Sequence, residues 1–254
     1  MSKVIHILGN GDHATTFKFE ERKGTLLLCN MPPFDVPADK VYATCMVDFK
    51  MMAALTEGSL NLDMYRWVLG TRPKIWMNDP KRSQFYLKYA QNVREFYTNV
   101  PPYAKNATNF NCGHMATHYA AYRHKPDEIH LYGFDTLFDF NMRSVTDLYL
   151  SSDRGQVNNY RLINNWRPIW DSIFEEYDGK VKFVLHHSHD QLKVKKRDNI
   201  EIKTYDMKEA KKRMKLKSRE KSSKLNPELT PEQMQKLNRQ QRRAYEAQRR
   251  KGVL

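Results

Sequence analysis

The chain has 254 residues, of which 40% are hydrophobic, so it can form one well-packed core and an additional segment but not two full-sized domains. Its charge is unevenly distributed: residues 1–190 carry 22 basic and 21 acidic side chains, whereas residues 191–254 carry 21 basic and eight acidic ones. No window approaches the ~20 consecutive apolar residues of a membrane span, and the N-terminal apolar run is too short for a secretion signal. The three cysteines lack a CxxC spacing, so we expect a cytoplasmic protein.

Short apolar runs alternate with helix-like stretches over residues 1–190, which is typical of parallel strands joined by crossovers. The pattern predicts an α/β domain. Strands are expected at Val4–Leu8, Thr25–Cys29, Val41–Val47, Lys74–Met77, Glu128–Tyr132 and Val181–Leu185. Helices are expected at Phe49–Leu55, Arg82–Phe96, Cys112–Arg123 and Asn158–Glu176, where apolar residues recur every three or four positions.

Residues 191–254 have few large apolar side chains and contain basic runs such as Lys211-Lys212-Arg213. Thr230 suits an N-cap and Pro231 the first helical position, so a helix is predicted from there to about residue 248. We therefore expect a basic, partly helical and partly disordered tail that binds nucleic acid or another polyanion through phosphate attraction. The alternative is a solvated extension that only improves solubility.

A glycine turn, Gly9-Asn10-Gly11-Asp12, follows the first predicted strand. Small residues at the exit of a parallel strand allow a ligand to approach the backbone, and free amides there attract phosphate. The spacing also satisfies the G-x-G-x-x-A dinucleotide fingerprint, although the second strand ends in Asn30 rather than in a carboxylate. The turn is thus a candidate phosphate site, and a simple tight turn is the alternative.

Further polar or glycine positions follow other predicted strands or open a helix. Asn30 and Asp48 end the second and third strands, where a turn cap or a helix N-cap is the alternative for each. Gly113 and His114 open a helix, and Gly133-Phe134-Asp135 follows the strand Glu128–Tyr132. Because parallel strands share one carboxyl edge, these residues are candidates for a common nucleotide site.

The order of these motifs resembles the bacterial CMP-sialic-acid-dependent sialyltransferases and the related motility accessory factor and 6-hydroxymethylpterin pyrophosphokinase-like group, over residues 1–187. The resemblance implies a single Rossmann-like domain, with an open, mostly parallel sheet and helices on both faces, and suggests a phage-encoded member. It also implies that the cofactor is a CMP-linked or other nucleotide sugar, contacted by Asn10, Asn30, Gly113 and His114, with Gly133 and Asp135 bordering the pocket.

The stretch that matches the family's catalytic loop, residues 148–155, contains no histidine, although the family uses one there as general base. Tyr149 and Arg154 are candidates to stabilise a departing phosphate, because a phenol and a cation can both face developing negative charge. Asp153 or Asp135 is the candidate base for an acceptor hydroxyl; pairing with a nearby arginine is the alternative for each.

Three histidines, His186, His187 and His189, follow one another closely at the last predicted strand. Adjacent strand residues point to opposite faces, so at most His187 and His189 share one, and no cysteine or acidic cluster with ligand spacing accompanies them. No metal site is predicted. His13 and His114, beside the glycine turns, are better placed for proton transfer.

Three hypotheses follow from the sequence. The first is a nucleotide-sugar-dependent glycosyltransferase whose basic tail holds an anionic acceptor. The second is a non-enzymatic nucleic-acid-binding protein with a degenerate Rossmann-like body. The third is an NAD-dependent oxidoreductase, which the dinucleotide spacing alone supports.

Overall fold

The computed structural model describes residues 3–19, 23–30, 34, 36–47, 64–70, 78–104, 110–139 and 162–206. The chain divides into two compact units, Met1–Asp206 and Met207–Leu254, and all described residues belong to the first. The strands are β1 (Val4–Leu8), β2 (Thr25–Cys29), β3 (Ala43–Met46), β4 (Trp67–Leu69), β5 (Val93–Phe96), β6 (Glu128–Tyr132), β7 (Lys182–His187) and β8 (Ile200–Thr204). The α-helices are α3 (Pro80–Tyr89), α4 (Cys112–Tyr119) and α7 (Arg167–Glu176).

Shorter helical turns connect several of these elements. The 3-10 turns are Asp12–Thr16, Ala38–Lys40, Ala90–Asn92, Pro102–Ala104 and Asp135–Leu137. The π-helical turns are Ala120–His124, which continues α4, and Leu162–Trp166, which leads into α7.

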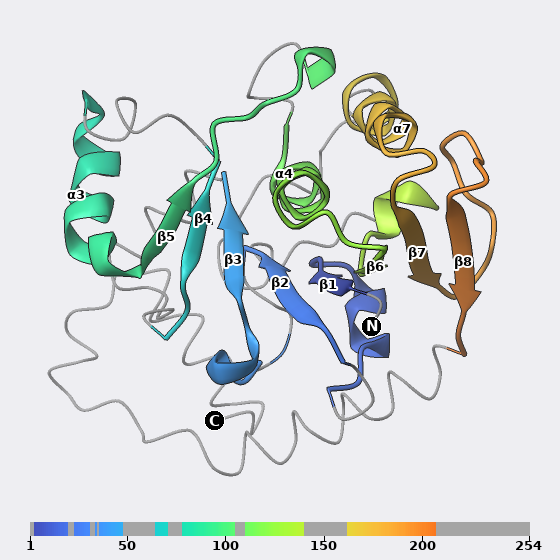
Figure 1. The fold of residues 1–254 in the computed structure, drawn as a ribbon, viewed down its shortest axis with the longest axis horizontal. Coiled ribbons are helices and arrows are strands. Elements are labelled where there is room, and N and C mark those ends of the chain that lie inside the picture. The colour runs from blue at the N-terminus through green and yellow to red at the C-terminus, as the bar shows by residue number, and fades with distance from the viewer. Residues whose placement is uncertain are drawn as a thin grey trace, which may run out of the picture. The chain divides into compact units, whose positions relative to one another are not determined.

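The strands form one 8-stranded sheet in the order β5-β4-β3-β2-β1-β6-β7-β8, and every pairing is parallel (Figure 1). The chain therefore builds the sheet outward from β1 to β5, returns to place β6 on the other side of β1, and continues to β8. This reversal of direction defines a doubly wound, Rossmann-like α/β fold. The predicted fold class is confirmed.

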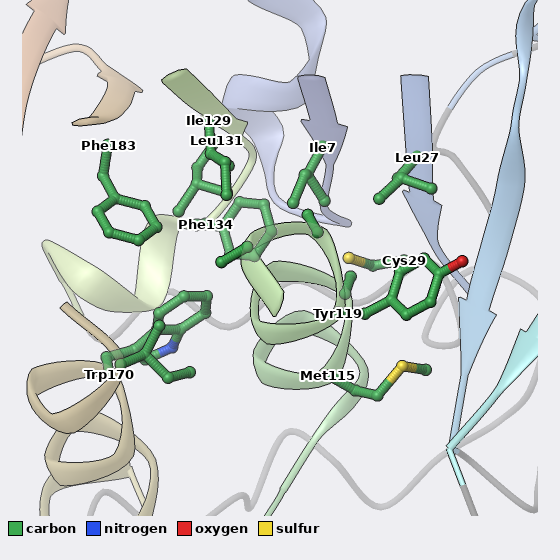
Figure 2. Close-up of a cluster of buried hydrophobic side chains, with 14 of the residues drawn as sticks. Ile7, Leu27, Cys29, Met115, Tyr119, Ile129, Leu131, Phe134, Trp170 and Phe183 are labelled. Carbon is green, nitrogen blue, oxygen red and sulfur yellow. The ribbon is translucent and has the colours of Figure 1, made fainter. Parts of the chain in front are cut away.

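Each face of the sheet carries its own hydrophobic core, because neighbouring residues of a strand point to opposite sides. One core lies beneath α4 and α7, and Figure 2 shows how side chains from β1, β2, β6 and β7 meet the two helices there. Its labelled members are Ile7, Leu27, Cys29, Met115, Tyr119, Ile129, Leu131, Phe134, Trp170 and Phe183. The opposite core includes Trp67, whose ring stacks on Phe85 and Tyr89 of α3. Helices thus pack on both faces.

Several strands and helices agree with the sequence-based expectations. The expected strands Val4–Leu8, Thr25–Cys29 and Glu128–Tyr132 have the observed bounds, and β3 and β7 lie within two residues of theirs. The expected helix at Cys112–Arg123 is α4 with its π turn, and the described part of the stretch expected at Asn158–Glu176 is helical.

The helix expected at Arg82–Phe96 is wrong at its C-terminal end, because Val93–Phe96 is strand β5. Phe85, Tyr89 and Val93 happen to continue a helical spacing, but the chain leaves the helix at the 3-10 turn Ala90–Asn92. There the Asn92 side chain donates a hydrogen bond to the Tyr65 carbonyl (3.1 Å), which fixes the entry to β5 beside β4. The helix expected at Phe49–Leu55 and the strand expected at Lys74–Met77 lie outside the described residues.

The boundary of the basic tail also needs correction. Residues 191–206, which the charge pattern assigned to the tail, contain β8, and β8 pairs with β7 along its whole length. The first compact unit therefore extends to Asp206. The helix predicted from Thr230 lies outside the described residues. Among the described residues, no helix has the length and apolar character to cross a bilayer.

Candidate functional site

The sheet reverses its winding between β1 and β6, because the chain continues from β1 to β2 on one side and from β6 to β7 on the other. In open parallel sheets such a reversal opens a crevice at the carboxyl ends of the strands, where ligands bind. The turn after β1 begins at Gly9 and the turn after β6 begins at Gly133, so two of the predicted glycine motifs lie at this point. The position of the candidate site follows from the strand order alone.

The two glycine turns pack directly against each other. The Gly9 amide donates to the Tyr132 carbonyl (2.7 Å), and the Gly11 amide donates to the Gly133 carbonyl (2.9 Å). A Cβ on Gly9 would lie 2.6 Å from the Gly133 oxygen, and one on Gly11 would lie 2.5 Å from the Asp135 carboxylate. These glycines are therefore required for close packing between the turns, and their amides are not the free phosphate donors that the sequence suggested.

Asn30, Gly113 and His114 fix the start of α4. Asn30, in the left-handed region at φ 56°, accepts a hydrogen bond from the Cys112 thiol through Oδ1 (3.0 Å). Asn111 is the N-cap: its Oδ1 accepts from the His114 amide (3.0 Å), and its own amide donates to His114 Nδ1 (3.2 Å). A Cβ on Gly113 would lie 3.0 Å from the Phe134 ring, so this glycine allows the helix to approach β6.

The His114 ring is fully buried, and both of its nitrogens are bonded. Because Nδ1 accepts from the Asn111 amide, Nε2 carries the proton and donates to the Trp166 carbonyl (3.0 Å). His114 therefore joins α4 to the chain that enters α7. The sequence assigned it to a nucleotide base and ribose; its observed contacts are those of a capping residue.

A buried cluster of side chains, His13, Asp135 and His187, lies at the carboxyl ends of β1, β6 and β7. His13 lies on the 3-10 turn Asp12–Thr16, and its Nδ1 is 2.8 Å from Oδ1 of Asp135. The His13 ring stacks on that of His187, with centroids 3.7 Å apart and planes inclined by 27°. The exposed fractions are 7%, 5% and 1% for His13, Asp135 and His187.

His187 also contacts side chains outside this cluster. Its ring stacks on Phe138 at 4.0 Å, and its Nε2 lies 3.8 Å from Oδ2 of Asp139. The His189 amide donates to His187 Nδ1 over 3.3 Å. Burial lowers the pKa of His187 to about 4, with the nearby His13 and His189 acting in the same direction and Asp135 opposing them. The imidazole is therefore neutral near pH 7.

Arg167, at the start of α7, holds the loop that carries Asp135 and Asp139. Its Nε donates to the Thr136 carbonyl (3.1 Å), and a terminal nitrogen donates to the Asp139 carbonyl (3.0 Å). Burial lowers the pKa of this guanidinium, while the Asp139 carboxylate acts in the opposite direction. Two carbonyl contacts from one buried cation fix the position of this loop after β6.

On the opposite face of the sheet, a chain of hydrogen bonds links β6, β7 and Tyr205. The Tyr205 hydroxyl lies 2.9 Å from His186 Nδ1, His186 Nε2 lies 3.0 Å from His130 Nδ1, and His130 Nε2 lies 3.2 Å from the Glu128 carboxylate. Since the carboxylate can only accept, the donors run from Tyr205 toward Glu128. These hydrogen bonds give both nitrogens of the buried His130 and His186 rings a partner. Among the described hydrogen bonds, none connects this series to the cluster of His13, Asp135 and His187.

The residues that the sequence predicted for the site differ in their exposure. Asn30 and Asp135 are buried, and so are Gly9, Gly11, Gly133 and His114, whereas Asn10 and Gly113 keep partial exposure. Asp48, Tyr149, Asp153 and Arg154 lie outside the described residues.

Sequence reasoning missed the cluster around His187 and the role of Arg167. The cluster brings together three segments that are more than fifty residues apart, which no local spacing reveals. The signal that was available is that His13, Asp135 and His187 each follow, within a few residues, a strand expected in the same parallel sheet. Compared with known proteins, the chain matches no family model, no curated protein and no solved structure.

Proposed function

We propose that this protein binds a nucleotide, in the form of a nucleotide-activated sugar, at the carboxyl ends of the strands around β1 and β6, and transfers the sugar to an acceptor hydroxyl. The observation that carries the proposal is the reversal of strand order at this point. In doubly wound sheets this is where nucleotides and related phosphate ligands bind.

The start of α4 supports the same location for the phosphates. A Cβ on Gly113, the second residue of α4, would lie 3.0 Å from the Phe134 ring, so the positive end of the helix dipole lies close to the turn after β6. Asn10, on the turn after β1, keeps partial exposure and has an amide side chain that can contact phosphate or ribose. The buried residues Asn30 and His114 position the start of α4, and Asp135 lies against the turn after β1.

The transfer itself requires three changes at the sugar. The acceptor oxygen bonds to the anomeric carbon, the bond from that carbon to the nucleotide phosphate breaks, and the acceptor proton passes to a base. In this proposal Asp153 accepts the proton, while Tyr149 and Arg154 stabilise the departing phosphate. These roles rest on the sequence positions of the three residues.

The second compact unit supports a polyanionic acceptor or partner. Residues 207–254 carry 16 basic and five acidic side chains. Such a segment attracts nucleic acid or another polyanion, with an affinity that falls steeply as salt displaces the released counterions. Replacement of Lys211, Lys212 and Arg213 by glutamine should lower retention on nucleic acid, and equal retention across a salt series would remove this part of the proposal.

The main test is calorimetric titration of the full chain with CMP, UDP, GDP and NAD. We expect a nucleoside phosphate to bind and the Asn10→Ala variant to weaken that binding about tenfold, the equivalent of one lost hydrogen bond to a charged group. Asn99→Ala is the matched control, because Asn99 is exposed and follows the edge strand β5. If none of the four binds at millimolar concentration, the proposal is wrong; selective binding of NAD would favour the oxidoreductase instead.

A further inference from the structure

We propose that His13, Asp135 and His187 form a binding site for a divalent transition-metal ion of the zinc class. One ligand atom from each of these side chains lies within 4.8 Å of the other two. Two imidazole nitrogens and a carboxylate oxygen are ligands that Zn²⁺, Co²⁺ and Ni²⁺ prefer, whereas Mg²⁺ and Ca²⁺ prefer oxygen alone. The inference does not require that the crevice bind a nucleotide.

The second observation is that the polar atoms of this cluster are buried without hydrogen-bond partners. Both ring nitrogens of His13, Oδ1 of Asp135 and Nε2 of His187 lack a partner among the described residues. All three side chains are more than nine-tenths buried. Leaving buried polar atoms unpaired is costly and rare in folded proteins, so the grouping of several such atoms within a few ångströms indicates a ligand that bonds to more than one of them.

A simple ion pair between His13 and Asp135 does not account for the cluster. Nδ1 and Oδ1 lie 2.8 Å apart, which is ion-pair range, but without the alignment of a hydrogen bond. The pair would also leave Nε2 of His13 and Nε2 of His187 buried and unsatisfied. A metal ion accepts one lone pair from each ring and one from the carboxylate, and therefore gives a partner to His187 Nε2, to one nitrogen of His13 and to the Asp135 oxygen.

Metal binding requires a small rearrangement of the two rings. They are stacked with an inclination of 27° and centroids 3.7 Å apart, so the lone pairs of their nitrogens lie in two separate, nearly parallel planes and do not meet at one point. One ring must turn about its Cβ–Cγ bond to bring both nitrogens to an ion. Ligation through His187 Nε2 also places the ring proton on Nδ1, which gives up the long 3.3 Å contact from the His189 amide.

Three protein ligands leave a coordination position open. Structural zinc sites usually have four protein ligands, whereas catalytic sites have three and an exchangeable water. Asp139 and His189 form a second group with His187, and all members of that group likewise lie within 4.8 Å of one another. His187 belongs to both groups, so the other ligands decide which group holds the ion.

The test is titration of tag-free, full-length protein with ZnCl₂ in a calorimeter, and with CoCl₂ by visible absorption. All nine histidines of the chain precede residue 190, so an untagged chain has no histidine in its basic tail. We expect one tight Zn²⁺ equivalent, and for Co²⁺ an absorption band of the intensity typical of four- or five-coordinate sites. His13→Ala and Asp135→Asn should each weaken Zn²⁺ binding at least tenfold.

Two control variants distinguish the site from its neighbours. His124→Gln removes a histidine near the opposite, amino edge of the sheet, where the His124 carbonyl accepts from the Lys3 ammonium group, and should leave the titration unchanged. His189→Ala should have little effect, whereas a loss with His189→Ala but not with His13→Ala would overturn the assignment in favour of the Asp139 group.

Absence of stoichiometric Zn²⁺ and Co²⁺ binding by the wild-type chain would overturn the proposal outright, and this result does not depend on whether any variant folds. Binding that persists unchanged in folded His13→Ala and Asp135→Asn proteins would also overturn it. Because the titrations use the metal alone, their outcome is independent of whether CMP or another nucleotide binds. A protein that binds Zn²⁺ but no nucleotide would refute the proposed transferase and keep the metal site.

Discussion

Replacement of Gly133 by alanine tests whether the two turns at the crevice are packed as closely as the structure shows. Gly133 has φ +75°, and an added Cβ would lie 2.8 Å from the Ala14 Cβ and 2.9 Å from the Gly11 oxygen. The left-handed backbone costs an alanine about 1–2 kcal/mol, and overpacking against a fixed backbone costs about 1–3 kcal/mol more. Because the reduced entropy of the unfolded chain lowers the backbone part to about 1 kcal/mol, we expect the free energy of unfolding to fall by roughly 2–4 kcal/mol in total.

The chain contains a matched control for the backbone contribution. Gly179 has φ +69°, and an added Cβ would meet no atom within 4 Å. Gly179→Ala should therefore lose only the backbone part, about 1 kcal/mol after the reduced entropy of the unfolded chain is counted. The difference between the two variants measures the packing of the turns.

The assay is urea unfolding of the wild type and both variants, followed by far-UV circular dichroism. For a body of this size, each 1 kcal/mol corresponds to about 2–4 °C in melting temperature, which provides an independent readout. Equal losses for Gly133→Ala and Gly179→Ala would refute the close approach of the two turns at Gly133.

Three further predictions concern other parts of the body. Asn111→Ala should lower the free energy of unfolding by about 1 kcal/mol in urea denaturation, because the cap of α4 is lost, and Asn111→Asp should retain most of it. Burial lowers the pKa of His118 below its ordinary value of 6.5, with Glu176 opposing, so protonation favours the unfolded chain. Stability should therefore be fully present above about pH 6.5 and fall as the pH decreases below it; the His118→Gln variant should show a shallower decrease in melts between pH 7 and pH 4.5. Phe183→Ala should cost about 3–5 kcal/mol in the same unfolding assay, because its ring fills the core beneath α7 (Figure 2).

Each of these has an outcome that would contradict it. An Asn111→Asp loss as large as that of Asn111→Ala would mean that the side-chain oxygen does not cap the helix. A pH profile that is identical in wild type and His118→Gln would mean that this histidine is not protonated differently in the two states. Leu87 is 71% exposed, so Leu87→Ala is the control for Phe183→Ala, and similar losses would contradict the placement of the core.

The sequence predicted the central strands and the helix α4 well, because these elements carry their signals locally. Val4–Leu8 and Glu128–Tyr132 are apolar runs bounded by turn residues, and the capping pattern at Asn111 marks the start of a helix. Strand β4 is only three residues long, and β8 lies in a lysine-rich stretch, so neither has such a signal. Both depend on pairing with a neighbouring strand.

The closeness of the two glycine turns was predictable from the sequence, but the contacts of their side chains were not. Strand exits in a parallel sheet share an edge, and that rule correctly placed the turns at Gly9 and Gly133 together. Whether a given side chain faces a ligand or a neighbouring turn depends on packing across segments distant in sequence. Asp135 illustrates this, since its carboxylate lies against Gly11 and His13 rather than toward solvent.

The thiols of this protein offer a probe of its internal motions without any engineering. Cys29, Cys45 and Cys112 are the only cysteines, and all are buried around the start of α4 and the strands beneath it. Burial raises the pKa of Cys29 and Cys45, so reaction with an alkylating reagent must wait for the protein to open. Mass spectrometry of the alkylated peptides would then report how often this half of the domain opens, and a ligand that holds α4 in place would slow the labelling of Cys112.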